Sequence, residues 1–506
     1  MFEAAEVGRK LAKSDYKAQV PQLRSELLAV QQELRKAASF PVIVLFAGVD
    51  TAGKGETVNL LNEWMDPRWI LTRGYTDPSS DERERPRLWR YWRDLPPRGR
   101  LAIFLSAWYS SPILDRVAGR TRMAEFDSLL DQVAAFERAL TDDGAVIVKF
   151  WMHLSKKAQR KRLTEFAKDP VQRWRVTKDQ WKHWAMFDKF VSTADRAIRR
   201  TSTDAAPWHI VEGEDERYRT VAVATVLRDA IRRGIEQSSA RKSQPAGAAG
   251  RKRKADGPVR TIKRVEREFN VLDNLDLSQT LSDDTFDKQL AERQARLSPL
   301  QRTAIKQGVS TVIVFEGWDA AGKGGAIHRV TGSLDARDYQ VIPIAAPTDE
   351  ERAQHYLWRF WRHLSRRGRL TIFDRSWYGR VLVERVEGFA TEAEYMRAYG
   401  EINHFEEQLV NDGILLLKFW IHISKAEQLK RFKDRTRTAY KRWKITDEDW
   451  RNRKKWEDYT IAVNDMVERT STKIAPWTLV EGNDKNFARI KVLRTLSGRL
   501  EERLKG

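Results

Sequence analysis

The sequence predicts an α/β protein built from two tandem copies of one domain, each with a parallel β-sheet flanked by helices. The first observation is a repeat: GVDTAGKG begins at Gly48 and GWDAAGKG begins at Gly317, an offset of 317 − 48 = 269 residues. The same offset relates LWRYWRDLPPRGR (88–100) to LWRFWRHLSRRGR (357–369). Because the repeat is itself as long as a domain, it indicates duplication of a domain rather than a solenoid.

The second observation is the alternation of short apolar runs with longer helical stretches within each copy. In the second copy these runs are TVIVFE (311–316), QVIPI (340–344), LTIF (370–373), ILLLKFW (414–420) and WTLV (477–480). Strand-like runs that alternate with helices are typical of a parallel sheet. Charged amphipathic stretches at about 16–37 and 283–306 precede the two glycine motifs and predict one long helix each.

The repeat also predicts the domain organisation. We assign residues 1–237 to the first domain and residues 261–506 to the second. The segment between them, 238–260, is rich in Gly, Ala, Ser, Pro and basic residues, which is typical of a flexible linker. Its RKRK run at 251–254 could bind nucleic acid, although a solvated linker is the simpler interpretation.

Composition limits the classes of protein to which the chain can belong. Lys and Arg number 92 against 71 Asp and Glu, and the formal net charge of +21 predicts a polyanionic partner: nucleic acid, an acidic membrane surface or a phosphate-rich substrate. No apolar run is long enough for a membrane span, and the charged N-terminus lacks a signal-peptide pattern. Cysteine is absent, which excludes disulfides and cysteine nucleophiles. We therefore expect a cytoplasmic protein with no membrane partner.

The glycine motif of the second copy carries the most specific chemistry. Gly317, Gly322 and Lys323 have the spacing of a P-loop, and the motif directly follows the strand-like run TVIVFE. In a P-loop, backbone N–H groups and a helix N-terminus bind phosphate oxygens while the lysine neutralises their charge. The motif therefore predicts a phosphate-binding loop.

The loop departs from the P-loop pattern at one position. The pattern has Ser or Thr after the lysine as a Mg²⁺ ligand, but the chain has Gly324 there, and Gly55 in the first copy. We therefore expect carboxylates to hold the magnesium. Asp319 in the loop is one candidate ligand. Asp374 is the other, because it follows the run LTIF and ligands gather at the carboxyl ends of parallel strands.

Several charged residues follow Asp374 in the stretch FDRSWYGRVLVER. They are Arg375, Arg380, Glu384 and Arg385. Arginines beside a carboxylate suit a highly charged phosphoryl group in a site that excludes water, and an ordinary surface cluster of ion pairs is the alternative.

The first copy lacks much of this chemistry. It keeps Asp50 and Lys54 in its own glycine motif. At the offset of 269, however, its residues at the positions of Asp374, Arg375, Arg380 and Glu384 are Leu105, Ser106, Ser111 and Asp115. We therefore expect that the first copy does not catalyse.

A basic stretch distinguishes the copies a second time. RNRKK (451–455) corresponds to KHWAM (182–186) in the first copy. The candidate phosphate-binding cations in and before this stretch are Lys441, Arg442, Lys444, Arg453 and Lys454. The stretch could form a mobile basic cover over bound phosphates or a solvated helical face, and both interpretations stay open.

The second half of the chain closely resembles family 2 of the polyphosphate kinases, and the first half resembles it more loosely. The motifs that carry the resemblance are EGWDAAGKGG (316–325), PTDEE (347–351), YLWRFWRHL (356–364), FDRSWYGRVLVERVEGF (373–389) and KFWIHISKAEQ (418–428). The resemblance implies a P-loop kinase fold similar to thymidylate kinases, with a helical lid. It also implies Mg²⁺-dependent transfer of a phosphoryl group between inorganic polyphosphate and a nucleotide.

Two-copy members resemble the subgroup that converts AMP to ADP, and the alternative is a polyphosphate-dependent kinase acting on ADP or GDP. By position, the resemblance implies that Asp319, Lys323 and Asp374 are the loop acid, loop lysine and metal acid. It implies that Arg359, Arg375, Arg380 and Glu384 bind phosphate or support the residues that do. We expect direct in-line transfer, with Asp319 orienting the acceptor phosphate.

Two rival functions stay open at this point. One is a P-loop nucleoside triphosphatase, against which Gly324 argues. The other is a non-enzymatic protein that binds polyanions such as nucleic acid, although no zinc-finger or RNA-binding signature is recognisable. The oligomeric state is also open, and a homo-oligomer is one of the alternatives.

Overall fold

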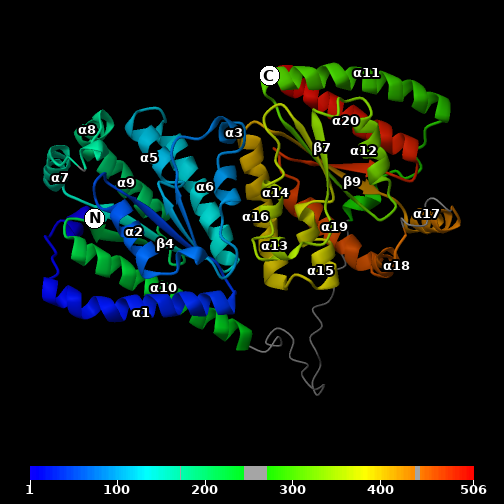
Figure 1. Cartoon of the computed structure of the whole chain (residues 1–506). Helices are drawn as coiled ribbons and strands as arrows, with labels where there is room; N and C mark the ends of the chain where they lie inside the picture. The colour runs from blue at the N-terminus through cyan, green and yellow to red at the C-terminus, as the bar shows by residue number, and fades with distance from the viewer. Residues whose placement is uncertain (171, 244–269, 439–444, 506) are drawn as a thin grey trace. The chain divides into compact units, whose positions relative to one another are not determined.

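The computed structural model describes residues 1–505 except 171, 244–269 and 439–444 (Figure 1). By contacts the chain divides into two units. The first unit comprises Met1–Pro78, Arg90–Asp256 and Thr348–His355; the second comprises Ser79–Trp89, Gly257–Pro347 and Tyr356–Gly506. Each unit therefore includes a short segment from the other half of the sequence. Most of the predicted linker, 238–260, lies outside the described residues, and the helix before it continues to Ser243.

The first copy forms a five-stranded parallel sheet with the order β2-β3-β1-β4-β5. The strands are β1 (Val42–Gly48), β2 (Ile70–Gly74), β3 (Leu101–Leu105), β4 (Val146–His153) and β5 (Trp208–Glu212). The helices are α1 (Lys13–Ala37), α2 (Lys54–Trp64), α3 (Ser80–Arg83), α4 (Trp89–Arg93), α5 (Ser110–Val117), α6 (Met123–Asp142), α7 (Lys156–Lys168), α8 (Lys178–Ala185), α9 (Phe187–Thr201) and α10 (Glu216–Ser243). Short 3-10 helices are η1 (Phe2–Ala5), η2 (Pro67–Trp69) and η3 (Arg173–Arg175).

The second copy repeats this sheet with the order β10-β9-β6-β8-β7. The strands are β6 (Thr311–Gly317), β7 (Tyr339–Pro343), β8 (Leu370–Asp374), β9 (Leu415–His422) and β10 (Trp477–Glu481). The helices are α11 (Asp283–Gln307), α12 (Lys323–Thr331), α13 (Asp349–Arg352), α14 (Trp358–Trp361), α15 (Val383–Glu387), α16 (Glu392–Asn411), α17 (Lys425–Arg437), α18 (Asp447–Lys454), α19 (Trp456–Thr470) and α20 (Lys485–Lys505). The 3-10 helices are η4 (Val271–Asn274) and η5 (Trp377–Arg380). The predicted α/β fold in two tandem copies is confirmed.

Helices cover both faces of each sheet, which explains the continuous apolar strand runs of the sequence. In the first copy, α1 and α10 pack together on one face, and α5, α6 and α9 pack together on the other (Figure 1). In the second copy, α11 and α20 pack together on one face, and α16 and α19 on the other (Figure 1). Every residue of β9 is buried. Among the described helices, none is both long and apolar enough to span a membrane.

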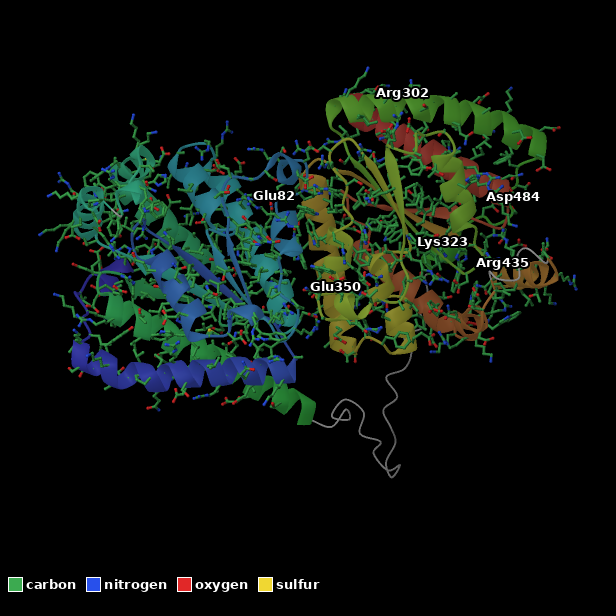
Figure 2. All side chains as sticks on the ribbon, in the orientation of Figure 1. Glu82, Arg302, Lys323, Glu350, Arg435 and Asp484 are labelled. Atoms are coloured by element: carbon green, nitrogen blue, oxygen red, sulfur yellow. The ribbon has the colours of Figure 1, made fainter. Side chains whose placement is uncertain are left out.

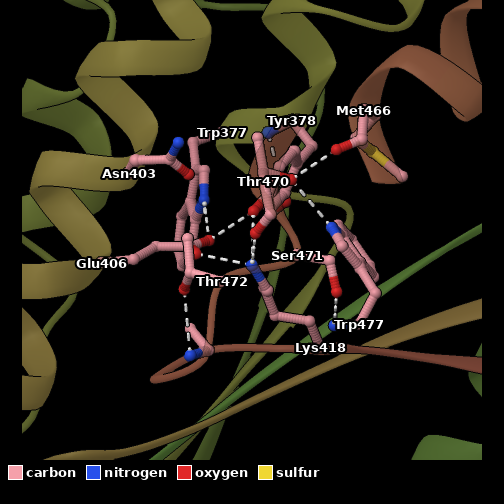
Figure 3. A network of polar contacts seen from close by, with 12 residues as sticks. Trp377, Tyr378, Asn403, Glu406, Lys418, Met466, Thr470, Ser471, Thr472 and Trp477 are labelled. Carbon is pink, nitrogen blue, oxygen red and sulfur yellow. Dashed lines mark hydrogen bonds and ion pairs between the residues drawn. The ribbon is translucent and has the colours of Figure 1, made fainter. Parts of the chain in front are cut away.

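A buried ion pair recurs in both copies and ties the sheet to its helices. In the second copy, Lys418 of β9 lies 2.6 Å from the Glu406 carboxylate of α16 and donates to the Tyr378 hydroxyl (2.9 Å) and the Thr470 carbonyl (2.8 Å) (Figure 3). A buried charge is tolerated only with such partners. Since Tyr378 belongs to η5, this network holds the chain that follows β8 against the rest of the domain.

The same network stands at the offset of 269 in the first copy. Lys149 lies 2.6 Å from Glu137 and donates to the Tyr109 hydroxyl (3.1 Å) and the Thr201 carbonyl (2.8 Å). Both copies therefore keep the scaffold that positions the segment after their third strand.

The strand register brings the two predicted ligand-bearing segments together. In the second copy β6 lies between β8 and β9, with Phe315 opposite Asp374 and Gly317 opposite Ile421. The chain runs from β6 to the far edge of the sheet at β7 and returns to β8 beside β6; β9 and β10 then lie on the other side of β6, so the order reverses there. Ligands bind outside the carboxyl ends of strands at such a switch point.

Candidate active site

The glycine loop between β6 and α12 has a backbone that only particular residues can adopt. Gly317 has φ of 148°, and a Cβ there would lie 2.5 Å from the carbonyl oxygen of Ile421. Gly322 precedes α12 with φ of 116° and provides no side-chain cap for the helix. The first N–H groups of α12 therefore stay available for an anion. Among the described residues, no heavy atom outside the backbone of α12 itself and the neighbouring residues lies within 4 Å of a Cβ placed on Gly324, so the position that usually holds a hydroxyl is open.

Lys323 is the first residue of α12, directly after the glycine loop (Figure 2). Its Nζ donates to the carbonyl oxygens of Gly317 (2.8 Å) and Trp318 (3.2 Å). Burial and the nearby Arg375 lower the pKa of Lys323, whereas Asp319 and other acids oppose that shift. The two carbonyl contacts position the lysine without neutralising its charge.

Asp319 is fixed by partners from three other segments. Its Oδ1 accepts from Nη2 of Arg375 (2.9 Å) and its Oδ2 accepts from Nδ2 of Asn452 on α18 (2.9 Å). Its backbone carbonyl accepts from Nε2 of Gln428 on α17 (3.2 Å). Both carboxylate oxygens are therefore engaged, and the carboxylate sets the position of the Arg375 guanidinium.

Asp374 ends β8 beside the strand that leads into the glycine loop. In the part of the chain that the structure describes, its carboxylate has no hydrogen bond or ion pair. Its charge nevertheless acts on Lys323 and Arg375, whose pKa values it raises, as well as on Glu316. Asp374 is thus an available carboxylate among cations, as the sequence predicted for a metal ligand.

Glu316 is a second acid at this site that the sequence analysis did not single out. It is buried at the end of β6 and accepts a hydrogen bond from the Ser376 hydroxyl (2.8 Å). Burial raises the pKa of Glu316, and Lys323 and Arg375 oppose that shift. A comparison of the two copies could have identified Glu316 and Ser376 as candidate site residues, because the first copy has Ala47 and Ala107 at their positions.

Arg375 has an unusual backbone conformation. Its φ is 65°, in the left-handed region that non-glycine residues rarely adopt, and its N–H donates to the Phe315 carbonyl (3.0 Å). Strain of this kind persists only where the surrounding structure imposes it, and it gathers at functional sites. The conformation turns the chain directly after Asp374, so that consecutive residues present an acid and a cation to one loop.

Arg380, Glu384 and Arg359 form a second charged group of the second copy. Nε of Arg380 lies 3.2 Å from Oε2 of Glu384, and its guanidinium carbon lies 4.6 Å from the ring centre of Tyr356. Arg359 donates to the Ala345 carbonyl (3.1 Å). Burial raises the pKa of Glu384 while Arg380 and Arg359 oppose that shift, so these three predicted residues act on one another.

Arg385 lies elsewhere. Its Nη1 donates to Oδ2 of Asp465 (2.7 Å) and to the hydroxyl of Tyr399 (2.9 Å). These partners belong to α19 and α16, so Arg385 joins three helices, and among the described residues it has no hydrogen bond or ion pair with the glycine loop. Its predicted phosphate-binding role has no support from this geometry.

The predicted basic cover is described only in part, because Lys441, Arg442 and Lys444 lie outside the described residues. On α18, Arg453 donates to the Lys425 carbonyl (2.6 Å) and to Oε1 of Gln428 (3.1 Å), and Lys454 is exposed. Through Arg453 and Asn452, α18 contacts both α17 and the glycine loop. The contact of Asn452 with Asp319 was not predicted, since the sequence analysis considered this stretch only for its basic residues.

Comparison with known proteins identifies the family. Residues 10–239 and 280–506 match the family described as polyphosphate kinase 2 (PPK2). The chain belongs to the polyphosphate kinase 2 family. A relative from Pseudomonas aeruginosa named "Polyphosphate:AMP phosphotransferase" is 53% identical over 501 residues, 99% of each chain. One of the same name from Acinetobacter johnsonii is 37% identical over 91% of each chain.

Solved structures agree with this assignment. A crystal structure from Pseudomonas aeruginosa, titled as a polyphosphate kinase 2, superposes with a TM-score of 0.88 at 50% identity and covers 100% of this chain and 99% of that chain. A relative with one copy also matches: a "GDP-polyphosphate phosphotransferase" from Mycobacterium tuberculosis is 41% identical over 216 residues, 43% of this chain and 73% of that protein. The predicted family resemblance is confirmed over both copies.

The first copy of this polyphosphate kinase 2 chain preserves the loop and its acid, Asp50, but has Ala47 and Leu105 at the positions of Glu316 and Asp374. Lys54 donates to the carbonyls of Gly48 (2.7 Å) and Val49 (3.0 Å), as Lys323 does to their counterparts. The Asp50 carboxylate instead pairs with Nδ1 of His183 (2.8 Å), the residue at the position of Asn452. Ser106 keeps the positive φ, 53°, of Arg375 without its cation.

Proposed function

We propose that the second copy of this polyphosphate kinase 2 chain transfers the terminal phosphoryl group of inorganic polyphosphate to AMP, forming ADP. The observation that carries the proposal is the convergence of Lys323, Arg375 and the available Asp374 carboxylate on one glycine loop. AMP is favoured over ADP or GDP because relatives matching both copies over nearly their whole length carry the name polyphosphate:AMP phosphotransferase.

We further propose that the loop functions as a P-loop and that Mg²⁺ is the cofactor. The residues fit this ion: Asp374 is an available hard oxygen ligand, and Glu316 lies close enough to interact with it. Mg²⁺ is usually held by one or two carboxylates together with substrate phosphates. Accordingly, the described residues include no group of three or more acids and histidines arranged as a metal site. When bound, Mg²⁺ would neutralise charge on the phosphate oxygens.

This proposal changes the role we expect for Asp319. Because Arg375 and Asn452 already engage both of its oxygens, Asp319 is less suited than Asp374 to be the main metal ligand. We assign it instead to positioning Arg375 toward the transferring phosphoryl group. Orientation of the acceptor phosphate by Asp319, as the sequence predicted, would require release of one of these partners.

The chemistry needs charge compensation and alignment more than covalent participation of the protein. The N–H groups at the start of α12 and the ammonium of Lys323 would bind phosphate oxygens, and Arg375 would stabilise charge in the transition state. An oxygen of the AMP phosphate forms a bond to the terminal phosphorus of polyphosphate, and the bond from that phosphorus to the bridging oxygen breaks. Arg359 and Arg380 would bind the remaining phosphates of either substrate.

The test is a direct assay of acceptors. The full chain is incubated with Mg²⁺ and polyphosphate and, separately, with AMP, GMP, ADP or GDP, and the products are separated by anion exchange. We expect ADP from AMP to form faster than ATP from ADP. Faster phosphorylation of ADP or GDP would move the chain to the diphosphate-kinase function, and nucleoside triphosphate hydrolysis without polyphosphate would contradict both.

A further inference from the structure

The helix that follows the glycine loop of the first copy carries an acid, Glu56, at a position where the second copy has Gly325. Glu56 lies in the first turn of α2, and its carboxylate binds arginines from three other segments. Arg162 of α7 donates to Oε2 (2.8 Å) and Arg175 of η3 donates to Oε1 (3.2 Å). Arg219 of α10 also donates to Oε2. Three guanidinium groups thus surround one carboxylate, as they would surround a phosphate.

The cluster lies against the glycine loop itself. A Cβ on Gly53, the residue before α2, would lie 2.5 Å from the guanidinium carbon of Arg219. The Arg219 side chain is 1% exposed, and its Nε has no hydrogen-bond partner among the described residues. Gly53 provides no side-chain cap for the N–H groups of the first turn of α2. The site therefore combines one buried and two partly buried arginines with the uncapped start of α2.

Electrostatics keep the acid ionised there. Burial opposes ionisation, yet Arg162, Arg219 and Arg175 together hold the pKa of Glu56 below its ordinary value. Its side chain is 28% exposed. Glu56 is therefore a charged anion next to the N-terminus of α2, where a negative charge is favoured.

The second copy has no acid at this position, and its arginine contacts the glycine loop directly. Its residue at the position of Glu56 is Gly325, and a Cβ there would lie 3.3 Å from Nη2 of Arg489. Arg431, the counterpart of Arg162, donates to the carbonyls of Ala320 (3.0 Å) and Ala321 (2.8 Å) within the glycine loop.

The acid that pairs with Arg431 comes from its own helix. Nε of Arg431 lies 2.7 Å from Oε1 of Glu427 on α17, and the first copy has Ala158 at the position of Glu427. Burial together with Arg329 and Arg431 lowers the pKa of Arg489, as expected where cations gather. The carboxylate that pairs with this arginine is thus Glu427 on α17 in the second copy and Glu56 on α2 in the first copy.

We propose that Glu56 is a built-in anion that occupies the phosphate site of the first copy and closes its glycine loop to polyphosphate and to nucleotide phosphates. The first copy is then catalytically inactive for two separate reasons. It has neutral residues at the positions of Asp374 and Glu316, and the Glu56 carboxylate occupies its anion site. Removing the carboxylate would leave Arg162, Arg175 and Arg219 without their shared acid and open to an external phosphate. Glu56→Gly, which installs the residue of the second copy, should therefore create a phosphate-binding site.

The experiment counts binding sites for inorganic tripolyphosphate on the full chain by isothermal titration calorimetry. We expect one site in the unchanged chain and two in Glu56→Gly. Gly325→Glu, the reciprocal change, should remove the site of the second copy, and the double exchange should again show one site. Adding Lys54→Ala to Glu56→Gly should remove the new site.

Thermal melting provides a second measurement in case the exposed arginines weaken the fold. Tripolyphosphate should then raise the melting temperature of Glu56→Gly, and of Glu56→Ala, by more than that of the unchanged chain, because a ligand stabilises the state that binds it. Equal shifts, or a single site in a folded Glu56→Gly chain, would overturn the proposal. So would two sites in the unchanged chain, one of them lost on Lys54→Ala. Since these comparisons concern the first copy, they stay interpretable even if the proposed acceptor at the second copy is wrong.

Discussion

Replacing Lys323 by alanine, with Lys54→Ala as its matched control, tests the division of labour between the two copies. The two lysines have nearly the same surroundings, since each Nζ donates to two loop carbonyls at distances between 2.7 and 3.2 Å. Neither is paired directly with a carboxylate. Loss of either lysine should therefore disturb the folded loop to a similar degree, and a difference in turnover reports on chemistry.

The expected magnitude follows from the charge that Lys323 supplies. Two unit charges about 4 Å apart interact by about 4 kcal/mol at an effective dielectric constant of about 20. If most of this interaction develops in the transition state, the loss is about a thousandfold in rate, because each ~1.4 kcal/mol is tenfold. We expect losses of roughly 10²–10⁴ for Lys323→Ala and for Asp374→Asn. Lys54→Ala should cost far less, since Leu105 and Ala47 stand at the positions of its metal acids.

The assay is the initial rate of ADP formation from polyphosphate and AMP at saturating Mg²⁺, with melting curves to show that each variant is folded. The decisive quantity is the ratio of the two losses, not either loss alone. A Lys54→Ala chain that is folded but as inactive as Lys323→Ala would mean that the first glycine loop takes part in turnover. The proposed roles of both copies would then be wrong.

Three further predictions concern salt, the buried ion pair and pH. If the predicted basic cover between Lys441 and Lys455 binds polyphosphate, the KM for polyphosphate should rise steeply with ionic strength in steady-state assays, while the KM for AMP changes less. Equal dependence of the two KM values on ionic strength would refute a polyphosphate-binding role for the basic cover. Glu406→Gln should lower the free energy of unfolding in urea by about 3–5 kcal/mol, because it leaves Lys418 buried without its acid, and Glu137→Gln should do the same through Lys149 in the first copy. Burial lowers the pKa of His422 from 6.5 to about 4, so between these pH values the unfolded chain binds more protons than the folded chain. The free energy of unfolding should therefore fall by about 3 kcal/mol as the pH drops from 6.5 to 4. His422→Gln should flatten this part of the curve of unfolding free energy against pH.

The elements that the sequence predicts well are those specified by local pattern. The apolar runs of the second copy form β6 to β10, and the strand that contains LTIF, β8, ends at Asp374. The glycine spacing likewise specifies a loop and a helix start without reference to the rest of the chain. Asp374 could be placed because parallel strands present their carboxyl ends at one edge.

The contacts that the sequence did not predict depend on tertiary register. In the sequence, Glu316 is the last residue of an apolar run and has no obvious partner. It accepts a hydrogen bond from Ser376 and lies near Asp374 because β6 pairs with β8. Asn452 is hidden in a basic stretch, and its bond to Asp319 depends on where α18 packs. Arg385 is a further case: it lies close to Arg380 in sequence, but its contacts are with Asp465 and Tyr399, and its phosphate-binding role stays a prediction.

The duplication itself supplies an internal control for separating scaffold from chemistry. Among the features present in both copies, the buried lysine networks and the turn after the third strand serve the fold. The turn is informative because Ser106 keeps a costly positive φ although it presents no cation, so the backbone geometry comes from the scaffold and not from the arginine. What differs between the copies is charge: Glu316, Asp374 and Arg375 have been replaced by neutral residues in the first copy, while Glu56 has been added beside its loop. Since these exchanges remove the candidate metal ligands and a cation but leave the strand register intact, they are the basis for our prediction that the first copy folds like the second and does not catalyse.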